Sequence, residues 1–113
     1  MQKIEAIVRP EKLDDVKNAL TEAGFHGMNI VHVTGRGVQR GIVHQGRGGE
    51  SYTVDMLPKV KVEVVIADEQ VDTVVKIICD AAQTGNIGDG KLFVVPVSDA
   101  VRVRTGERGD EAV

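Results

Sequence analysis

Two copies of one strand-and-helix pattern follow each other in this chain, and the repeat limits its possible folds more than any other feature. The segment KIEAIVRPEKLDDVKNALTEA, from Lys3, aligns without a gap with KVEVVIADEQVDTVVKIICDA, from Lys61. In each copy a β-branched run predicts a strand, and an acidic turn then leads into apolar residues at helical spacing. A further strand-like run follows each copy, at 27–35 and at 91–97. Each half is therefore expected to be strand, helix, strand.

The two predicted helices each have one apolar face. Pro10 suits the first turn of a helix, where its missing N–H costs little. Apolar side chains then share one face in each copy, namely Leu13, Val16, Leu20 and Ala23 in the first and Val71, Val74, Val75 and Ile78 in the second. Cys79, the only cysteine, lies in the second pattern, and its apolar neighbours predict a buried thiol.

Two such halves predict an α+β fold, a ferredoxin-like βαββαβ sandwich with two helices on one face of four antiparallel strands. The other face of the sheet would stay open. We expect it to carry apolar side chains that are too numerous to leave in water, among them Ile7, Val31, Val33, Val65 and Val94. The sequence therefore predicts an oligomer that closes its sheets against one another.

The 113 residues fit one domain, 1–113, with two irregular parts. The connection between the halves, about 37–55, is much longer than an ordinary hairpin loop and is rich in glycine and arginine, so it is expected to be either functional or disordered. The segment after the fourth strand is expected to add a short strand with Arg102 and Arg104, followed by a flexible tail at about 106–113.

Composition excludes several classes of function. A net charge of −3 gives no broad attraction to nucleic acid phosphates, so any anion site must be local. The amino-terminal residues have neither the apolar core of a signal peptide nor the length of a membrane span, and we expect a cytoplasmic protein. His26, His32 and His44 do not have metal-ligand spacing, so no zinc is expected.

Two segments have the chemistry of an anion site. Gly88, Asp89, Gly90 and Lys91 stand directly before an apolar strand, where glycines let backbone N–H groups approach an anion and the lysine supplies a charge. The alternative is a plain turn that uses glycine for its backbone angles. Arg102 and Arg104 would point to one side of an extended chain and suit a polyphosphate, or would be solvated charges on an edge strand.

A third candidate pair, Gln39 and Lys59, flanks the long connection. The lysine can bind a small dicarboxylate and the glutamine oxygen can ligate Mg²⁺, although polar surface residues would look the same in sequence. Tyr52 is either a hydroxyl open to modification or an anchor of the loop.

Taken together, these residues resemble the PII nitrogen-regulatory signal-transduction family. The match runs along the whole chain. Four segments look like the corresponding segments of that family, namely the first strand and helix, DMLPKVKVEVV, TGNIGDGKLFVVPV and AVRVRTGERGDEAV. The resemblance implies a homotrimer that binds ATP or ADP between subunits and senses 2-oxoglutarate together with Mg-ATP. The long connection would be the T-loop, which docks onto ammonium transporters or onto enzymes and regulators of nitrogen metabolism. The protein would meet a membrane only through a transporter, and would not be an enzyme.

The resemblance also assigns residues. The nucleotide site would comprise Met28, Asn29, Gly35, Gly37, Val38, Gln39, Glu63, Val65, Gly88, Asp89, Gly90, Lys91, Arg102 and Arg104. The 2-oxoglutarate site would comprise Arg9, Gln39, Arg40, Gly41 and Lys59, with Gln39 also a ligand of Mg²⁺. Partner contact or modification would fall on Arg47, Ser51 and Tyr52. The chain departs from the family at Val38, where an arginine is usual, and at Ser51, an added residue before the tyrosine.

Other classes of protein share this fold. A small phosphohydrolase resembling acylphosphatase would use similar phosphate-binding features, but the sequence shows no evident nucleophile and base. An amino-acid-binding regulatory module is a further alternative. An RNA-binding module needs stacking aromatic side chains on its sheet, whereas this chain has only Phe25, Tyr52 and Phe93.

Overall fold

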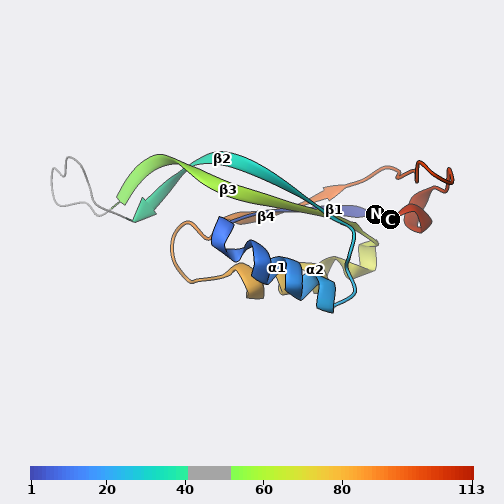
Figure 1. The fold of residues 1–113 in the computed structure, drawn as a ribbon, viewed down its shortest axis with the longest axis horizontal. Helices are drawn as coiled ribbons and strands as arrows, with labels where there is room; N and C mark the ends of the chain where they lie inside the picture. The colour runs from blue at the N-terminus through green and yellow to red at the C-terminus, as the bar shows by residue number, and fades with distance from the viewer. Residues whose placement is uncertain (41–51) are drawn as a thin grey trace.

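The computed structural model describes residues 1–40 and 52–113, which form a four-stranded antiparallel sheet with two helices on one face (Figure 1). The elements are the strands β1 (Gln2–Val8), β2 (Met28–Arg40), β3 (Tyr52–Ile66) and β4 (Lys91–Pro96) and the helices α1 (Leu13–Glu22) and α2 (Val71–Ala82). The strands lie in the order β2-β3-β1-β4. This arrangement confirms the ferredoxin-like α+β fold.

The repeat is visible in the structure. A short 3-10 turn precedes each helix, η1 (Pro10–Lys12) before α1 and η2 (Asp68–Gln70) before α2. The two repeated strands, β1 and β3, pair side by side with Glu5 opposite Glu63. One pair of equivalent residues, Glu5 and Glu63, therefore meets at the centre of the sheet.

The hydrophobic core fills the space between the sheet and the helices. Its buried members are Ile4, Ala6, Val8, Val16, Leu20, Val62, Val64, Ile66, Val74, Ile78 and Ala82. Leu13, Val71 and Val75 pack against this core and are partly buried. The prediction of a buried thiol was wrong, because Cys79 is exposed. It follows Ile78 directly, and a step of one residue turns a side chain by about 100° around a helix, off the apolar face.

The open face of the sheet is more polar than expected. Residues directly opposite each other in neighbouring strands point to the same side. Val94 lies opposite buried Ile4, which places it on the helix side, and Val95 occupies the open face instead, opposite Lys3. The prediction for Val94 was therefore wrong, whereas Ile7, Val31, Val33 and Val65 alternate onto the open face.

Charged side chains cross the middle of this open face. Lys3 Nζ lies 2.9 Å from Glu5 Oε1 and 3.6 Å from Glu63 Oε2, and Lys61 Nζ lies 3.8 Å from Glu63 Oε2. The hydrogen bond to Glu5 raises the pKa of Lys3, and the same bond lowers the pKa of Glu5. An oligomer that closes these sheets stays a prediction. Its interface would have to accommodate this charged row as well as the apolar side chains.

The hairpin of β2 and β3 extends past the other strands (Figure 1). Its ladder continues to the pair Arg40 and Tyr52, so both ends of the expected loop, 37–40 and 52–55, belong to strands. Ladder hydrogen bonds join backbone groups and require no apolar pattern, which is why periodicity did not reveal these ends.

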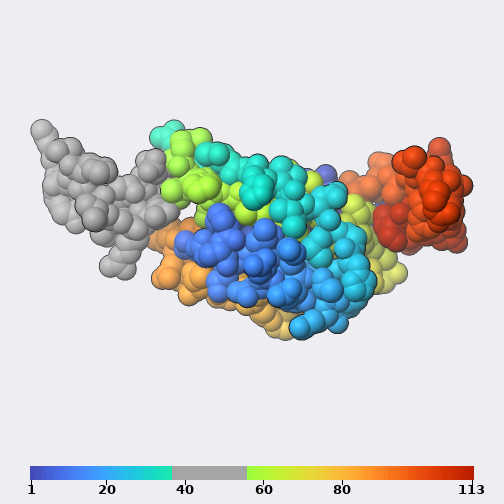
Figure 2. All heavy atoms as spheres, viewed as in Figure 1, coloured from blue at the N-terminus to red at the C-terminus, as the bar shows by residue number. Residues whose placement is uncertain are grey.

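The carboxy-terminal segment folds back on itself at the other end of the molecule (Figure 2). Val101 forms a β-bridge with Arg108, the Gly109 amide donates to the Ala100 carbonyl at 3.0 Å, and a 3-10 turn, η3 (Gly109–Ala112), follows. These contacts lie in the segment expected to be a flexible tail, about 106–113, and its flexibility stays a prediction. Within the described residues, no helix combines the length and the apolar character that crossing a membrane requires.

Candidate functional site

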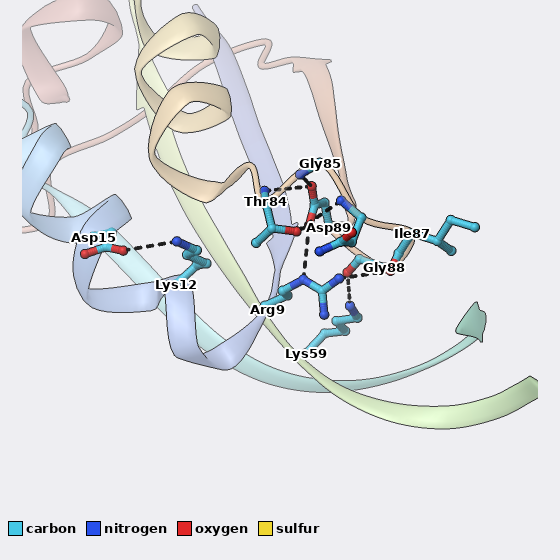
Figure 3. Close-up of polar contacts among 10 residues, drawn as sticks. Arg9, Lys12, Asp15, Lys59, Thr84, Gly85, Ile87, Gly88 and Asp89 are labelled. Carbon is cyan, nitrogen blue, oxygen red and sulfur yellow. Dashed lines mark hydrogen bonds and ion pairs between the residues drawn. The ribbon is translucent and has the colours of Figure 1, made fainter. Parts of the chain in front are cut away.

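The loop between α2 and β4, residues 84–90, is organised around the carboxylate of Asp89 (Figure 3). One carboxylate oxygen, Oδ2, accepts hydrogen bonds from the backbone amides of Thr84 (2.8 Å) and Gly85 (2.9 Å). The other oxygen, Oδ1, accepts from the Thr84 hydroxyl and from Arg9 Nε, the latter at 3.1 Å. The Thr84 hydroxyl is the chief cause that holds the pKa of Asp89 well below its usual range, against a smaller opposing effect of burial.

Arg9 and Lys59 hold two consecutive carbonyl groups of the same loop. Arg9 follows β1, and its Nη2 donates to the Ile87 carbonyl at 2.9 Å. Lys59 lies in β3, and its Nζ donates to the Gly88 carbonyl. Because the C=O and N–H of a trans peptide point in opposite directions, the amides of Gly88 and Asp89 point away from these two cations. Burial, helped by the positive charge of Arg9, lowers the pKa of Lys59.

A glycine is required at position 90 because β4 begins very close to β1. Its φ is +101°, and a Cβ atom at this position would lie 1.8 Å from the carbonyl oxygen of Ile7. Only glycine allows β4 to begin this close to β1. The plain-turn interpretation of the glycines therefore accounts for Gly90, and the anion-binding role of the loop stays a prediction.

A cleft of about 540 Å³ lies beside this loop, at the base of the β2–β3 hairpin. It is lined by Ile7, Gly35, Arg36, Leu57, Lys59, Ile87, Gly88, Gly90, Lys91 and Phe93. The lining residues include three basic side chains and, within the described part of the chain, no acidic one. The cleft therefore has the positive charge and the glycine backbone of an anion site. It brings together five of the residues assigned from the sequence, Gly35, Lys59, Gly88, Gly90 and Lys91.

Four other assigned residues lie farther along the sheet. Met28 packs against the core, Asn29 lies opposite Glu63 on the open face, and Val65 lies opposite Lys3. Glu63 takes part in the ion pairs of the open face. These four residues do not line the cleft.

The carboxy-terminal segment, to which Arg102 and Arg104 belong, lies at the opposite end of the sheet from the segment that joins α2 to β4 (Figure 1). The expectation of an extended strand was wrong here, because residues 103–105 form a turn and only Val101 makes a β-bridge. The two side chains therefore do not share one side through strand alternation. Arg102 binds Glu107 at 2.9 Å, and Arg104 is exposed.

Several assigned residues belong to the β2–β3 hairpin. The backbones of Gly37, Val38, Gln39, Arg40 and Tyr52 are paired in the β ladder. Gly41, Arg47 and Ser51 lie outside the described residues.

Sequence reasoning missed Thr84 and Glu107. Thr84 stands five residues before Asp89, and a hydroxyl near a glycine-flanked aspartate is a local signal of a side-chain-bonded turn. Glu107 stands five residues after Arg102, and nothing in the sequence shows that a turn brings the two together.

The fold and the cleft define a small α+β domain with a basic pocket at the root of a long hairpin, and comparison with known proteins identifies its family. The family model described as nitrogen regulatory protein P-II matches residues 1–107. This chain belongs to that family.

Related proteins match over nearly their whole length. Nitrogen regulatory protein P-II 2 of Methanothermobacter thermautotrophicus (strain Delta H) is 57% identical over 113 residues, which cover all of this chain and 97% of that protein. Nitrogen regulatory protein P-II of Rhodobacter capsulatus is 52% identical over all of both chains. The crystal structure of Arabidopsis thaliana PII bound to citrate superimposes with a TM-score of 0.80 at 43% identity, covering 99% of this chain and 91% of that one.

Proposed function

We propose that this P-II protein is a signal transducer that binds ATP or ADP and, together with Mg-ATP, 2-oxoglutarate, and that it controls its targets through the T-loop. The observation that carries the proposal is the meeting of Arg9, Lys59 and the glycine loop at the base of the β2–β3 hairpin. A ligand bound there touches the root of the segment that would dock onto a target.

The nucleotide would bind with its phosphates at the glycine loop. Lys91 and Arg36 in the cleft lining supply positive charge, and the glycine backbone allows close approach. The carboxy-terminal segment of the same chain, which contains Arg102 and Arg104, lies at the far end of the sheet (Figure 1). If they clamp the same phosphates, a second subunit must supply them, which supports nucleotide sites between the subunits of a homotrimer. Met28, Asn29, Glu63 and Val65 would surround the base and ribose.

The carboxylates of 2-oxoglutarate would bind Lys59 and Arg9. Both cations now donate to carbonyl groups, and a carboxylate is the stronger acceptor for a charged donor. The crystal structure of Arabidopsis thaliana PII contains bound citrate, which is a carboxylate ligand. Gln39, Arg40 and Gly41 would complete this pocket at the end of β2.

The residues present fit Mg²⁺ only if the ion binds together with ATP. The described residues contain no group of three or more His, Cys, Asp or Glu side chains able to hold a metal. Mg²⁺ commonly keeps several waters and binds phosphates plus one or two protein oxygens, so a single side-chain oxygen from Gln39 is enough. Gln39 would hold the ion, whose positive charge would offset the negative charges of the phosphates and the keto acid.

The T-loop would carry the signal to ammonium transporters or to enzymes and regulators of nitrogen metabolism. Ligands at its root would shift its population of conformers through their differential affinity. Arg47, Ser51 and Tyr52 would provide partner contacts or a modification site, and Val38 in place of an arginine would change the balance between ATP and ADP. We place this non-enzymatic protein in the cytoplasm.

Calorimetry tests the proposal directly. 2-Oxoglutarate is titrated into the protein with Mg-ATP present and, separately, without nucleotide. We expect measurable binding only in the first titration, because the metal and phosphates complete the pocket. Equal binding in both titrations, or none in either, would contradict the proposal.

A further inference from the structure

The guanidinium of Arg102 is engaged within its own chain. Its Nη1 donates to Glu107 Oε1 at 2.9 Å, and its Nη2 donates to the Glu111 carbonyl at 2.8 Å. A phosphate that binds the outer edge of a guanidinium with two parallel hydrogen bonds uses these same two nitrogens. Such a phosphate therefore has to displace or share the two internal contacts of Arg102.

The turn between these residues fixes Glu107 in place. The amide of Arg102 donates to the Glu107 carbonyl at 2.9 Å, and the Gly106 amide donates to the Arg102 carbonyl at 2.7 Å. The Glu107 amide donates to the Thr105 hydroxyl at 3.2 Å. Backbone hydrogen bonds thus hold the carboxylate beside the guanidinium, so little further ordering of the chain is needed to form the ion pair.

We propose that Glu107 is an affinity-setting residue: an internal carboxylate that competes with the nucleotide phosphates for Arg102. The inference rests on the proposed function, in which Arg102 binds a polyphosphate. A carboxylate and a phosphate present similar pairs of anionic oxygens to a guanidinium. Binding of the nucleotide then requires exchange of one anion for another, and the ion pair weakens binding by the free energy of breaking it.

The expected effect is modest because the pair is partly exposed. The side chains of Arg102 and Glu107 are 39% and 40% exposed, in a segment that projects from the body of the protein (Figure 2). Pairs of this kind contribute up to about 1 kcal/mol, which corresponds to a change in affinity of about two- to five-fold.

The test compares the affinity for ADP of the wild type with that of Glu107→Gln, by calorimetry at fixed salt concentration. Glu111→Gln is the matched control, because Arg102 contacts only the backbone carbonyl of that residue. Both substitutions remove one negative charge from the carboxy-terminal segment, but only the first removes the competing side chain. We expect Glu107→Gln to bind ADP about two- to five-fold more tightly than Glu111→Gln does.

The role of Arg102 is tested in a second background. In protein carrying Arg102→Ala, the two glutamine substitutions are expected to give equal affinities, since no guanidinium remains to compete for. Equal affinities already in the wild-type background, or weaker binding by Glu107→Gln, would overturn the inference while leaving the proposed function intact. A wild-type protein that does not bind ADP would instead contradict the proposed function itself. Thermal unfolding of each variant shows whether it is folded.

Discussion

Replacing Asp89 with asparagine is expected to weaken the loop that shapes the anion cleft. The carboxylate has two donors on each oxygen, the amides of Thr84 and Gly85 on one and the Thr84 hydroxyl and Arg9 on the other. An asparagine has only one oxygen. If it faces the two amides, its NH₂ group meets Arg9, which is itself a donor, and the charged hydrogen bond is lost.

The size of the effect follows from that one bond. A hydrogen bond to a charged group contributes about 1.5 to 3 kcal/mol, and the partial exposure of both side chains favours the lower end. We therefore expect Asp89→Asn to lower the free energy of unfolding by about 1 to 2 kcal/mol. Urea unfolding at one protein concentration measures this, as a shift of the midpoint of about 0.5 to 1 M.

The pH dependence gives an independent check. The pKa of Asp89 is lowered in the folded state, so its contribution to stability is present above the ordinary pKa of an aspartate, about 3.9, and is lost as the pH falls below it. The difference between wild type and Asp89→Asn should stay constant from pH 7 to pH 5.5 and shrink below pH 4. The matched control, Asp80→Asn, removes an exposed i,i+4 pair with Lys76 and should cost less than about 0.5 kcal/mol. Equal losses in the two variants would refute this reasoning.

Three further outcomes are expected. Gly90→Ala should lower the free energy of unfolding by about 3 kcal/mol or more, because a Cβ would overlap the Ile7 carbonyl. Gly85→Ala, at a similar φ but in open space, should lower it by about 1 to 2 kcal/mol, and chemical unfolding compares the two variants. Lys59→Ala should abolish the 2-oxoglutarate response and leave ADP binding nearly intact, whereas the exposed control Lys17→Ala should change neither; a normal response by Lys59→Ala in calorimetry would remove Lys59 from the site. The wild type should show no multiple turnover of ATP or of an acyl phosphate in a phosphate-release assay, and sustained turnover would favour the phosphohydrolase.

The repeat made most of the fold predictable. Strand and helix patterns are local, and their duplication from Lys3 and Lys61 limits the topology to few choices. The errors came from details that depend on pairing or on turns. Val94 was placed on the wrong face because the face depends on register with β1, which a continuous apolar run does not specify.

The site was predictable in its residue types and not in its contacts. The resemblance to the family pointed to Lys59 and the glycine loop, which the structure brings to one cleft. The bonds from Arg9 to Ile87 and from Lys59 to Gly88 join residues 78 and 29 positions apart, beyond the reach of local patterns. Strand alternation did not predict that a turn pairs Arg102 with Glu107, and the phosphate role that the resemblance gives Arg102 stays a prediction.

Native mass spectrometry with ADP tests the central claim most directly, because it reports assembly and occupancy in one spectrum. If anion sites form between neighbouring subunits, the spectrum should show trimers that carry up to three ADP molecules, and any monomers should carry none. A monomer that binds ADP as well as the trimer does, or a trimer that stays free of nucleotide, would contradict the account.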